Sequence, residues 1–339
     1  IMEIYQVGGS VRDEMLGHKP IDKDWVVVGS SPEEMEAKGF IPIGKDFPVF
    51  LHPTSNEEYA LARTEKKIAE GYKGFKFYCS PDITLEEDLI RRDLTINSIA
   101  KDSNGKIIDP CNGSKDIAKK IFRNTSDAFN EDPLRAIRVA RFSSYKKLHD
   151  FKISNSLYGA IEEIVSKDEL NTLSAERVFA ESQKAMQNQY PSNFFENIIR
   201  LNLKDPWFKN LEKVPFLNAK SVNHKWLQLE LGNDFKITKI LPASTKLKSE
   251  IKVFMNLIEI SNCNEHDTLT KKILELHPER HLELIKGLQN EFDSTLKVKK
   301  IEKIIENYMR IDFKDLSKLS HDEIIKAKIS RVSRMLNEL

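Results

Sequence analysis

The sequence predicts an α/β fold for the first third of the chain and an elongated, all-helical remainder. Up to about Ile121, short runs rich in β-branched and aromatic residues alternate with segments that have helical spacing. Beyond this point strand signals fade, and helical segments follow one another through short polar connections. No repeat or low-complexity tract interrupts the pattern, so the 339 residues are expected to form two or three globular domains.

The first strands and helices have well-marked boundaries. "MEIYQV" and "KDWVVVG" are predicted strands, and the helix between them starts after a glycine pair and stops near Gly17. In "SSPEEMEAKGF", Ser31 is a predicted N-cap, Pro32 takes the first helical position and Gly39 ends the helix. Further strands are expected in "PVFLHP", "EEYALARTE" and "KIIDP", and a helix capped by Thr84 in "TLEEDLIRRDLTINSIA".

Four helices are expected in the segments after Ile121. They lie in "SDAFNEDPLRAIRVARFSSYKKL", "SLYGAIEEIVSKDEL", "SAERVFAESQKAMQ" and "SNFFENIIRL". Past Leu203 the pattern stays mostly helical, although "DPWFKNLEKVPFLN" predicts a loop-rich join.

The composition, 40% hydrophobic and 31% charged, is typical of a soluble globular protein. No apolar run approaches the roughly 20 residues that span a bilayer, and the start of the chain shows no signal-peptide pattern. Cys79, Cys111 and Cys263 lack metal-ligand spacing, and their odd number argues against a disulfide framework. We therefore expect a cytoplasmic protein without a membrane partner. The net charge of +1 neither supports nor excludes a nucleic-acid partner.

Asp22 and Asp24 flank Lys23 at the entrance to the predicted strand "WVVVG". In an extended segment the two-residue period points both carboxylates to one face. Mg²⁺ takes one or two protein carboxylates together with substrate phosphates, and two such ions about 3.5–4 Å apart bridge the attacking and leaving oxygens of phosphoryl transfer. Asp-x-Asp is also common in turns before strands, so the pair alone does not decide between the two interpretations.

Gly8, Gly9 and Ser10 lie between an expected strand and an expected helix. Backbone N–H groups gather at such a junction, and glycines let the backbone approach a phosphate closely. Arg12 adds a fork of donors to the same anion. A phosphate cradle shortly before a metal-binding strand indicates nucleotidyl transfer, and the pattern is neither the Walker nor the dinucleotide glycine motif.

A third metal-binding carboxylate is expected at Glu58 or Glu57, at the start of "EYALAR" on a neighbouring strand. Glu58 is the preferred candidate, but the choice depends on the strand register, which the sequence does not give. Simple alternation along the strand puts Arg63 on the face opposite to Glu58.

"LIRRDLTINSIA" places Asp93 and Asn97 at the i, i+4 spacing of one helix face, where they could hold ribose hydroxyls. Arg91 and Arg92 beside them could reach a phosphate. The alternative interpretation is an exposed helix on which Asp88 pairs with Arg92 at i, i+4. Such a pair stabilises a helix by only a few tenths of a kcal/mol. The alternative is compatible with the nucleotide-binding interpretation.

In "NEDPLRAIRVARF", Pro133 at a helix start makes Asp132 a natural N-cap. Asp132 and Arg135 also offer an acceptor and a planar donor fork three residues apart, which suits the Watson–Crick edge of cytosine or adenine. Arg138 and Arg141 continue the stripe, and no acidic residue lies between Arg135 and Arg141. We therefore favour a nucleotide-binding role for this helix over a salt-bridged surface helix.

The motifs quoted above, with "GKDFPVFLHP" and "SAERVFAE", resemble in order and spacing the bacterial class II tRNA nucleotidyltransferases, the CCA-adding and poly(A) polymerase family of the DNA polymerase beta superfamily. The resemblance covers about Tyr5 to Glu181. It implies a nucleotidyltransferase head with a mixed sheet, followed by a helical neck, body and tail. The expected ranges are head 1–121, neck 122–200, body 201–270 and tail 271–339.

The resemblance also implies roles for individual residues. Asp22 and Asp24 would be the catalytic aspartates that hold Mg²⁺. Asp132 and Arg135, assisted by Arg138, would form a protein template that selects CTP and ATP, while Glu176 and Arg177 would brace the neck. Together with the candidates from the residues themselves, nucleotide binding is expected of Gly8, Gly9, Ser10, Arg12, Arg91, Arg92, Asp93, Asn97, Asp132, Arg135, Arg138 and Arg141.

The implied reaction is template-independent addition of C, C and A to the 3′ end of tRNA with two Mg²⁺ ions. Lys and Arg residues between Lys297 and Arg334 are candidates for binding the acceptor arm and elbow of tRNA, and no DNA partner is expected. CC-only, A-only or poly(A) addition remain alternatives, and a catalytically inactive RNA-binding protein is a more distant one. Asp46 and Pro48 favour CCA addition over poly(A) addition.

Two further segments bear on the resemblance. Gly71 and Gly74 lie where the family has a flexible loop involved in the switch from C to A addition. The dipeptide His-Asp occurs at Glu265–Asp267 and His321–Glu323 without the other spaced histidines of an HD phosphohydrolase. We therefore expect both to be surface residues and expect a short form without an HD domain.

Overall fold

The computed structural model describes residues 2–20, 22–43, 49–67 and 75–339. These residues form two compact units. The first contains residues 1–217 with 239–242, and the second contains residues 218–238 with 243–339. This division into two units differs from the four ranges expected from the sequence, which stay a prediction.

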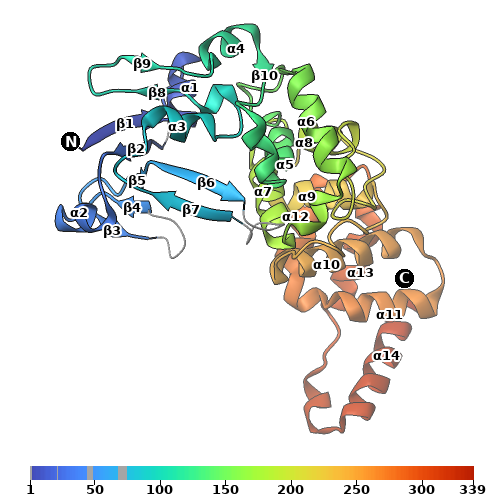
Figure 1. The fold of residues 1–339 in the computed structure, drawn as a ribbon. Helices are drawn as coiled ribbons and strands as arrows, with labels where there is room; N and C mark the ends of the chain where they lie inside the picture. The colour runs from blue at the N-terminus through green and yellow to red at the C-terminus, as the bar shows by residue number, and fades with distance from the viewer. Residues whose placement is uncertain (1, 21, 44–48, 68–74) are drawn as a thin grey trace. The chain divides into compact units, whose positions relative to one another are not determined.

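A seven-stranded mixed sheet lies in the N-terminal part of the first unit (Figure 1). β1 (Glu3–Val7) pairs antiparallel with β2 (Asp24–Val28), and β2 pairs parallel with β5 (Glu58–Leu61). The sheet order β3-β4-β5-β2-β1-β8-β9 is completed by β3 (Ile41–Pro42), β4 (Val49–Leu51), β8 (Ala100–Lys101) and β9 (Ile107–Ile108). The strands predicted in "MEIYQV", "WVVVG", "PVFLHP", "EYAL" and "KIIDP" are confirmed.

The segment "EEYALARTE" forms two strands instead of one. β5 ends at Leu61, and β6 (Arg63–Lys67) pairs antiparallel with β7 (Phe75–Cys79) in a separate sheet. The break falls at Ala62, whose N–H donates to the carbonyl of Val27 (2.8 Å). Side-chain alternation therefore does not continue from β5 into β6.

The described part of the range expected as the head contains the helices α1 (Gly9–Met15), α2 (Pro32–Ala37), α3 (Leu85–Ile90) and α4 (Gly113–Lys119). Ser31 caps α2 by accepting the N–H of Glu34, and Thr84 forms a capping box with Glu87 at α3, as the sequence predicts.

The prediction that helix α3 continues through "RRDLTINSIA" is wrong. Leu94 is extended and forms a β-bridge with Asn124, and the N–H of Thr95 donates to the carbonyl of Arg123 (2.9 Å). Only a short 3₁₀ helix, Thr95–Asn97, follows. These tertiary hydrogen bonds replace the local i→i−4 bonds that the helical spacing suggested.

The range expected to form the neck, 122–200, contains the helices α5 (Leu134–Phe142), α6 (Asn155–Ser166), α7 (Ala175–Gln187) and α8 (Pro191–Arg200). α5 packs against both α7 and α8. Two short parallel strands, β10 (Ile121–Phe122) and β11 (Lys152–Ile153), join the start of the neck. Phe194, Phe195 and Phe208 are fully buried, and their rings pack against one another.

The second unit is all helical around the buried Trp226 and Phe254. It contains α9 (Val222–Leu231), α10 (Thr245–Asn262), α11 (His266–Leu276), α12 (Pro278–Glu291), α13 (Val298–Tyr308) and α14 (His321–Asn337). Glu265–Asp267 and His321–Glu323 are exposed, so the prediction that they are surface residues is confirmed. Within the part of the chain that the structure describes, no helix has the length and apolar character needed to cross a bilayer.

Candidate active site

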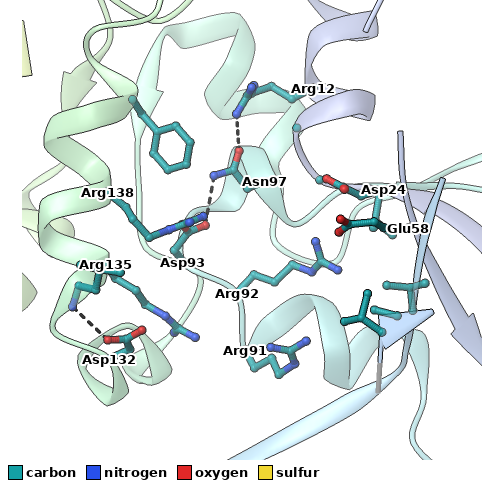
Figure 2. Close-up of a pocket in the computed structure, with 18 of the residues that line it drawn as sticks. Arg12, Asp24, Glu58, Arg91, Arg92, Asp93, Asn97, Asp132, Arg135 and Arg138 are labelled. Atoms are coloured by element: carbon teal, nitrogen blue, oxygen red, sulfur yellow. Dashed lines mark hydrogen bonds and ion pairs between the residues drawn. The ribbon is translucent and has the colours of Figure 1, made fainter. Parts of the chain in front are cut away.

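A cavity of about 570 Å³ opens in the first unit (Figure 2). Its wall combines the turn before α1, strands β2 and β5, the segment after α3, and the neck helices α5 and α7. Of the nucleotide-binding candidates, all but Ser10 and Arg141 line this cavity.

The glycine turn, Gly8–Arg12, forms one end of the cavity. Gly8 has φ +70, and its N–H donates to the carbonyl of Ile99 (3.0 Å). A Cβ added at Gly8 would lie 3.1 Å from Nη1 of Arg92. Ser10 instead turns inward, where its hydroxyl donates to the carbonyl of Val7 (3.0 Å). Glycine is thus required at position 8 for two reasons: the backbone has a positive φ, and the Arg92 side chain lies close to the position that a Cβ would take.

Replacing Gly8 with alanine is expected to destabilise the fold and also to displace Arg92. The positive φ alone should cost about 1–2 kcal/mol, which a denaturant titration measures. Gly17→Ala is the matched control, because Gly17 also has a positive φ (+78) but open space at its Cβ position. Both variants should lose similar stability, whereas only Gly8→Ala should weaken nucleotide binding. Equal nucleotide binding by the two variants would contradict this reading of the turn.

Asp24 and Glu58 form a carboxylate pair on neighbouring strands. They are register partners in the parallel β2–β5 ladder, both line the cavity, and Figure 2 shows their carboxylates side by side. Burial by the surrounding protein raises the pKa of Asp24; the charge of Arg92 opposes this shift and that of Asp22 adds to it. Asp22 itself lies in an exposed bend before β2, outside the cavity lining.

The structure distinguishes Glu58 from Glu57. The indole of Trp25 donates to Glu57 (3.1 Å), and Glu57 lies outside the cavity lining. The expectation that Arg63 faces away from Glu58 is wrong, since Arg63 also lines the cavity. The break at Ala62 between β5 and β6 explains this difference, because the two residues belong to different strands.

The carboxylate pair fits Mg²⁺, which needs only one or two protein carboxylates when substrate phosphates complete its coordination. The raised pKa of Asp24 supports this fit, because a nearby cation would relieve the cost of its negative charge. Among the described residues, no group of three or more His, Cys, Asp or Glu side chains converges as an all-protein metal site. Substrate oxygens would therefore have to supply the remaining ligands.

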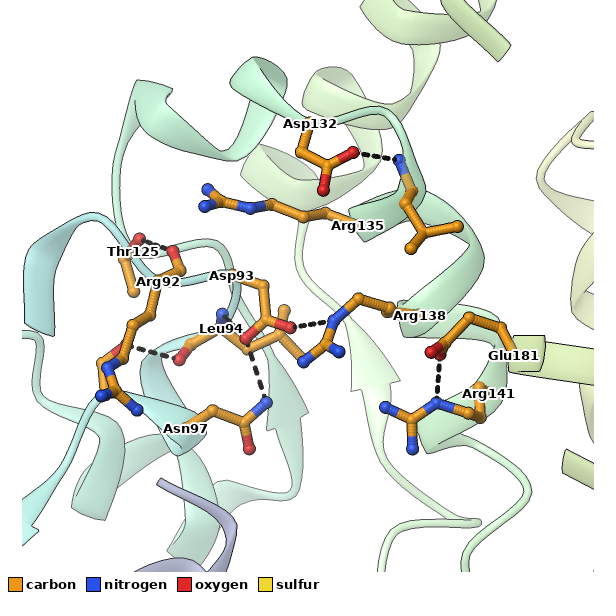
Figure 3. A network of polar contacts seen from close by, with 12 residues as sticks. Arg92, Asp93, Leu94, Asn97, Thr125, Asp132, Arg135, Arg138, Arg141 and Glu181 are labelled. Carbon is orange, nitrogen blue, oxygen red and sulfur yellow. Dashed lines mark hydrogen bonds and ion pairs between the residues drawn. The ribbon is translucent and has the colours of Figure 1, made fainter. Parts of the chain in front are cut away.

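A hydrogen-bond relay joins the glycine turn to neck helix α5 (Figures 2 and 3). Arg12 Nη1 donates to Asn97 Oδ1 (2.6 Å), Asn97 Nδ2 donates to Asp93 Oδ1 (3.1 Å), and Arg138 Nε donates to Asp93 Oδ2 (2.8 Å). Burial alone would raise the pKa of Asp93, but the charges of Arg138 and Arg135 hold it well below its usual range. Asp93 and Asn97 therefore contact each other, although they do not share an α-helix.

Asp132 and Arg135, for which the sequence predicts a base-reading role, both line the cavity. Arg177 on α7 holds the Asp132 carboxylate with two hydrogen bonds (3.3 and 2.7 Å), and the N–H of Leu134 donates to the same group (3.1 Å). Arg135 Nη1 donates to the carbonyl of Ala128. Glu176, in contrast, is exposed in the first turn of α7.

Arg141 does not reach the cavity, contrary to expectation. Its side chain is 6% exposed, and its guanidinium is paired with the buried Glu181 of α7 (Figure 3). The guanidinium also donates to the hydroxyl of Tyr145. From the sequence, we looked for acidic partners of the α5 arginines only within α5 itself. Glu181 from α7 and Asp93 from the head neutralise Arg141 and Arg138 instead.

Phe142 is a cavity residue that the sequence argument missed. Its ring lies 5.8 Å from the guanidinium carbon of Arg12, 5.4 Å from that of Arg138 and 4.4 Å from that of Arg141. Such contacts stabilise a guanidinium over an aromatic face. The i, i+4 spacing of Arg138 and Phe142 on α5 was the available signal.

Two candidate segments lie outside the described residues: Asp46 and Pro48, which were expected to favour CCA addition, and Gly71 and Gly74 of the expected loop.

Comparison with known families identifies two consecutive regions of the chain. Residues 4–123 match the "Poly A polymerase head domain", and residues 150–214 match the "Probable RNA and SrmB-binding site of polymerase A". With the carboxylate pair on a mixed sheet, the first region is the head of a nucleotidyltransferase. The two matched regions belong to the class II family of CCA-adding enzymes and poly(A) polymerases.

Individual relatives agree with this assignment. The chain is 52% identical over 201 residues to the multifunctional CCA protein of Cupriavidus taiwanensis, covering 58% of this chain and 48% of that protein. It thus spans about half the length of the curated relatives it matches.

Two solved structures share the fold. The Bacillus stearothermophilus CCA-adding enzyme in complex with CTP has a TM-score of 0.67 at 22% identity, covering 99% of this chain and 89% of that one. The Thermotoga maritima CCA-adding enzyme complexed with tRNA has a TM-score of 0.64 at 19% identity, covering 100% and 88%. The fold class predicted from the sequence, an α/β nucleotidyltransferase head followed by helices, is confirmed.

Proposed function

We propose that this chain adds C, C and A to the 3′ end of tRNA from CTP and ATP without a nucleic-acid template. One observation carries the proposal: a single cavity joins a carboxylate pair suited to metal-bound phosphates with a base-reading pair on a neck helix. Glycine and arginine donors lie between them. A nucleoside triphosphate needs these three kinds of contact together.

The triphosphate would be held by the glycine turn and by Arg12, Arg91 and Arg92, because guanidiniums donate planar pairs of hydrogen bonds to phosphate oxygens. Mg²⁺ held by the carboxylate pair, with Asp22 nearby, would supply electrostatic stabilisation of the reacting phosphate. Asp93 would accept a ribose hydroxyl while Arg138 and Asn97 fix its orientation.

The base would be selected by Asp132 and Arg135. Cytosine and adenine both present an amino donor beside a ring-nitrogen acceptor, which matches a carboxylate beside a guanidinium. Uracil and guanine would instead present a carbonyl to the carboxylate and leave polar groups unpaired, which a buried site penalises strongly. Arg177 supports this arrangement because it fixes the Asp132 carboxylate toward the cavity.

The relatives support these substrates. The Cupriavidus protein is named for CCA, the Bacillus structure is a complex with CTP, and the Thermotoga structure is a complex with tRNA. Lys and Arg residues between Lys297 and Arg334 are proposed to bind the acceptor arm and elbow of tRNA through its phosphates. The three cysteines are unpaired, which supports a cytoplasmic location.

The deciding experiment is extension of a labelled tRNA lacking CCA, with Mg²⁺ and CTP alone, ATP alone or both. We expect two nucleotides with CTP alone and completion to CCA with both. A tRNA already ending in CCA is the control and should not be extended. Long adenylate tails on varied RNAs would instead establish a poly(A) polymerase. Termination at CC in the presence of ATP, or addition of A only to a tRNA ending in CC, would establish a partial activity.

A further inference from the structure

Asp88 lies within α3 and forms ion pairs with Arg91 and Arg92, the arginine pair of the cavity. Its side chain is fully buried and does not line the cavity itself. Oδ1 accepts hydrogen bonds from Nε and Nη2 of Arg91 (3.2 and 2.7 Å), and Oδ2 accepts them from Nε and Nη2 of Arg92 (3.3 and 3.0 Å). One carboxylate thus holds both guanidiniums edge-on.

A third element meets the same carboxylate. The backbone N–H of Arg63, the first residue of β6, donates to Asp88 Oδ1 (3.2 Å), and Arg91 Nε donates to the carbonyl of Arg63 (2.7 Å). Asp88 therefore ties the arginine pair to the start of the β6–β7 sheet. Arg63 also lines the cavity, so Asp88 contacts three residues of the wall: Arg91 and Arg92 through their side chains and Arg63 through its backbone N–H.

The energetics differ from those of an ordinary helical ion pair. An exposed Asp–Arg pair at i, i+4 stabilises a helix by a few tenths of a kcal/mol, whereas a buried carboxylate is costly unless its charge and lone pairs are fully engaged. Burial alone would raise the pKa of Asp88, but the charges of Arg92 and Arg91 hold it below its usual value. Asp88 is therefore ionised at neutral pH and offsets the repulsion between two neighbouring guanidiniums.

We propose that Asp88 is a positioning residue for the triphosphate, which it serves by holding Arg91 and Arg92 as one pre-oriented set of donors. This inference rests on the proposed function. The Nη1 atom of Arg92 faces the glycine turn, close to the position a Cβ of Gly8 would take, so the orientation set by Asp88 directs Arg92 to the expected phosphate end of the cavity. Pre-oriented donors lose less conformational entropy when the anion binds.

The test measures binding of inorganic tripolyphosphate and of CTP, each with Mg²⁺, by calorimetry on the full chain, together with KM and kcat for extension. Asp88→Asn keeps the size of the side chain but removes its charge. We expect the dissociation constant for tripolyphosphate and the KM for both nucleotides to rise about tenfold. This is the lower end of the loss of affinity or activity, about 10–100-fold, that follows removal of a residue that orients a metal ligand. The preference for CTP over UTP should stay unchanged, because the base-reading pair lies on another element.

Glu87→Ala is the matched control on the same helix. Glu87 is exposed and completes the capping box with Thr84, so its loss weakens α3 without touching the arginine pair. Should Asp88→Asn fail to fold, Asp88→Glu keeps the charge but moves the carboxylate by one methylene, and it should also weaken tripolyphosphate binding.

Two outcomes overturn the proposal. A folded Asp88 variant that binds tripolyphosphate within twofold of the wild type would show that the arginine pair needs no support. An Asp88 variant that loses thermal stability and kcat, but keeps the wild-type KM and tripolyphosphate affinity, would show a merely structural role. Failure of the wild-type chain to bind CTP at all would instead count against the proposed function.

Discussion

Asp24→Asn is expected to reduce nucleotide addition by more than about 100-fold. Groups that only support a metal ligand typically contribute about 10–100-fold, and Asp24 is placed to bind the metal itself, in register with Glu58. The variant should fold normally, because Asp24 is the first residue of β2 and is not part of the hydrophobic clusters that pack against the sheet. Initial rates of tRNA extension at saturating CTP and ATP measure the effect.

Asp234→Asn is the control for this experiment, since the side chain of Asp234 is 81% exposed and forms only a surface pair with Lys236. An Asp24→Asn variant with more than a tenth of wild-type activity would remove the carboxylate pair from the mechanism. The pH profile gives a second check. Because burial raises the pKa of Asp24 in the metal-free protein, Mg²⁺ binding should weaken on acidification at a higher pH than it would with an ordinary aspartate.

Glu181→Ala is expected to destabilise the protein by about 3–5 kcal/mol, the usual cost of leaving one partner of a buried ion pair without the other. The side chains of Glu181 and Arg141 are only 4% and 6% exposed, and they join α7 to α5 beneath the cavity. A denaturant titration of the first unit's transition measures the change.

Glu283→Ala is the matched control, because the side chain of Glu283 is 89% exposed in a surface pair with Lys286 and its loss should have no measurable effect. The pKa of Glu181 is lowered, since the charges of Arg141 and Arg138 outweigh its burial. Its contribution is therefore complete above the unfolded pKa of about 4.3 and is lost as pH falls toward the folded pKa. Equal stability of the two variants would mean that Arg141 finds another partner.

Local chemistry in the sequence was enough to predict the caps and the first strands. Ser31, Pro32 and Thr84 act through atoms within three residues of themselves, so their roles do not depend on the rest of the fold. The place of Gly8 between a strand and a helix indicated a close approach of the backbone to a phosphate, whereas its positive φ became known only from the structure.

Contacts between distant segments could not be predicted in this way. The choice of Glu58 over Glu57 required the register of β2 against β5, which only the assembled sheet fixes. The acid that neutralises Arg141 comes from α7, forty positions along the chain. The two-residue strands β10 and β11 likewise exist only because they pair with each other.

The parallel pairing of β2 with β5 has a consequence for how the protein becomes active. Parallel neighbouring strands cannot be joined by a tight hairpin. The connection from β2 to β5 therefore contains α2, β3 and β4, and Glu58 can come beside Asp24 only when this long connection has closed. Closing such a long loop is a late and slow event in folding. A nascent or partly unfolded head would therefore lack the geometry to bind a divalent cation. Binding of the cation thus requires that the sheet is complete.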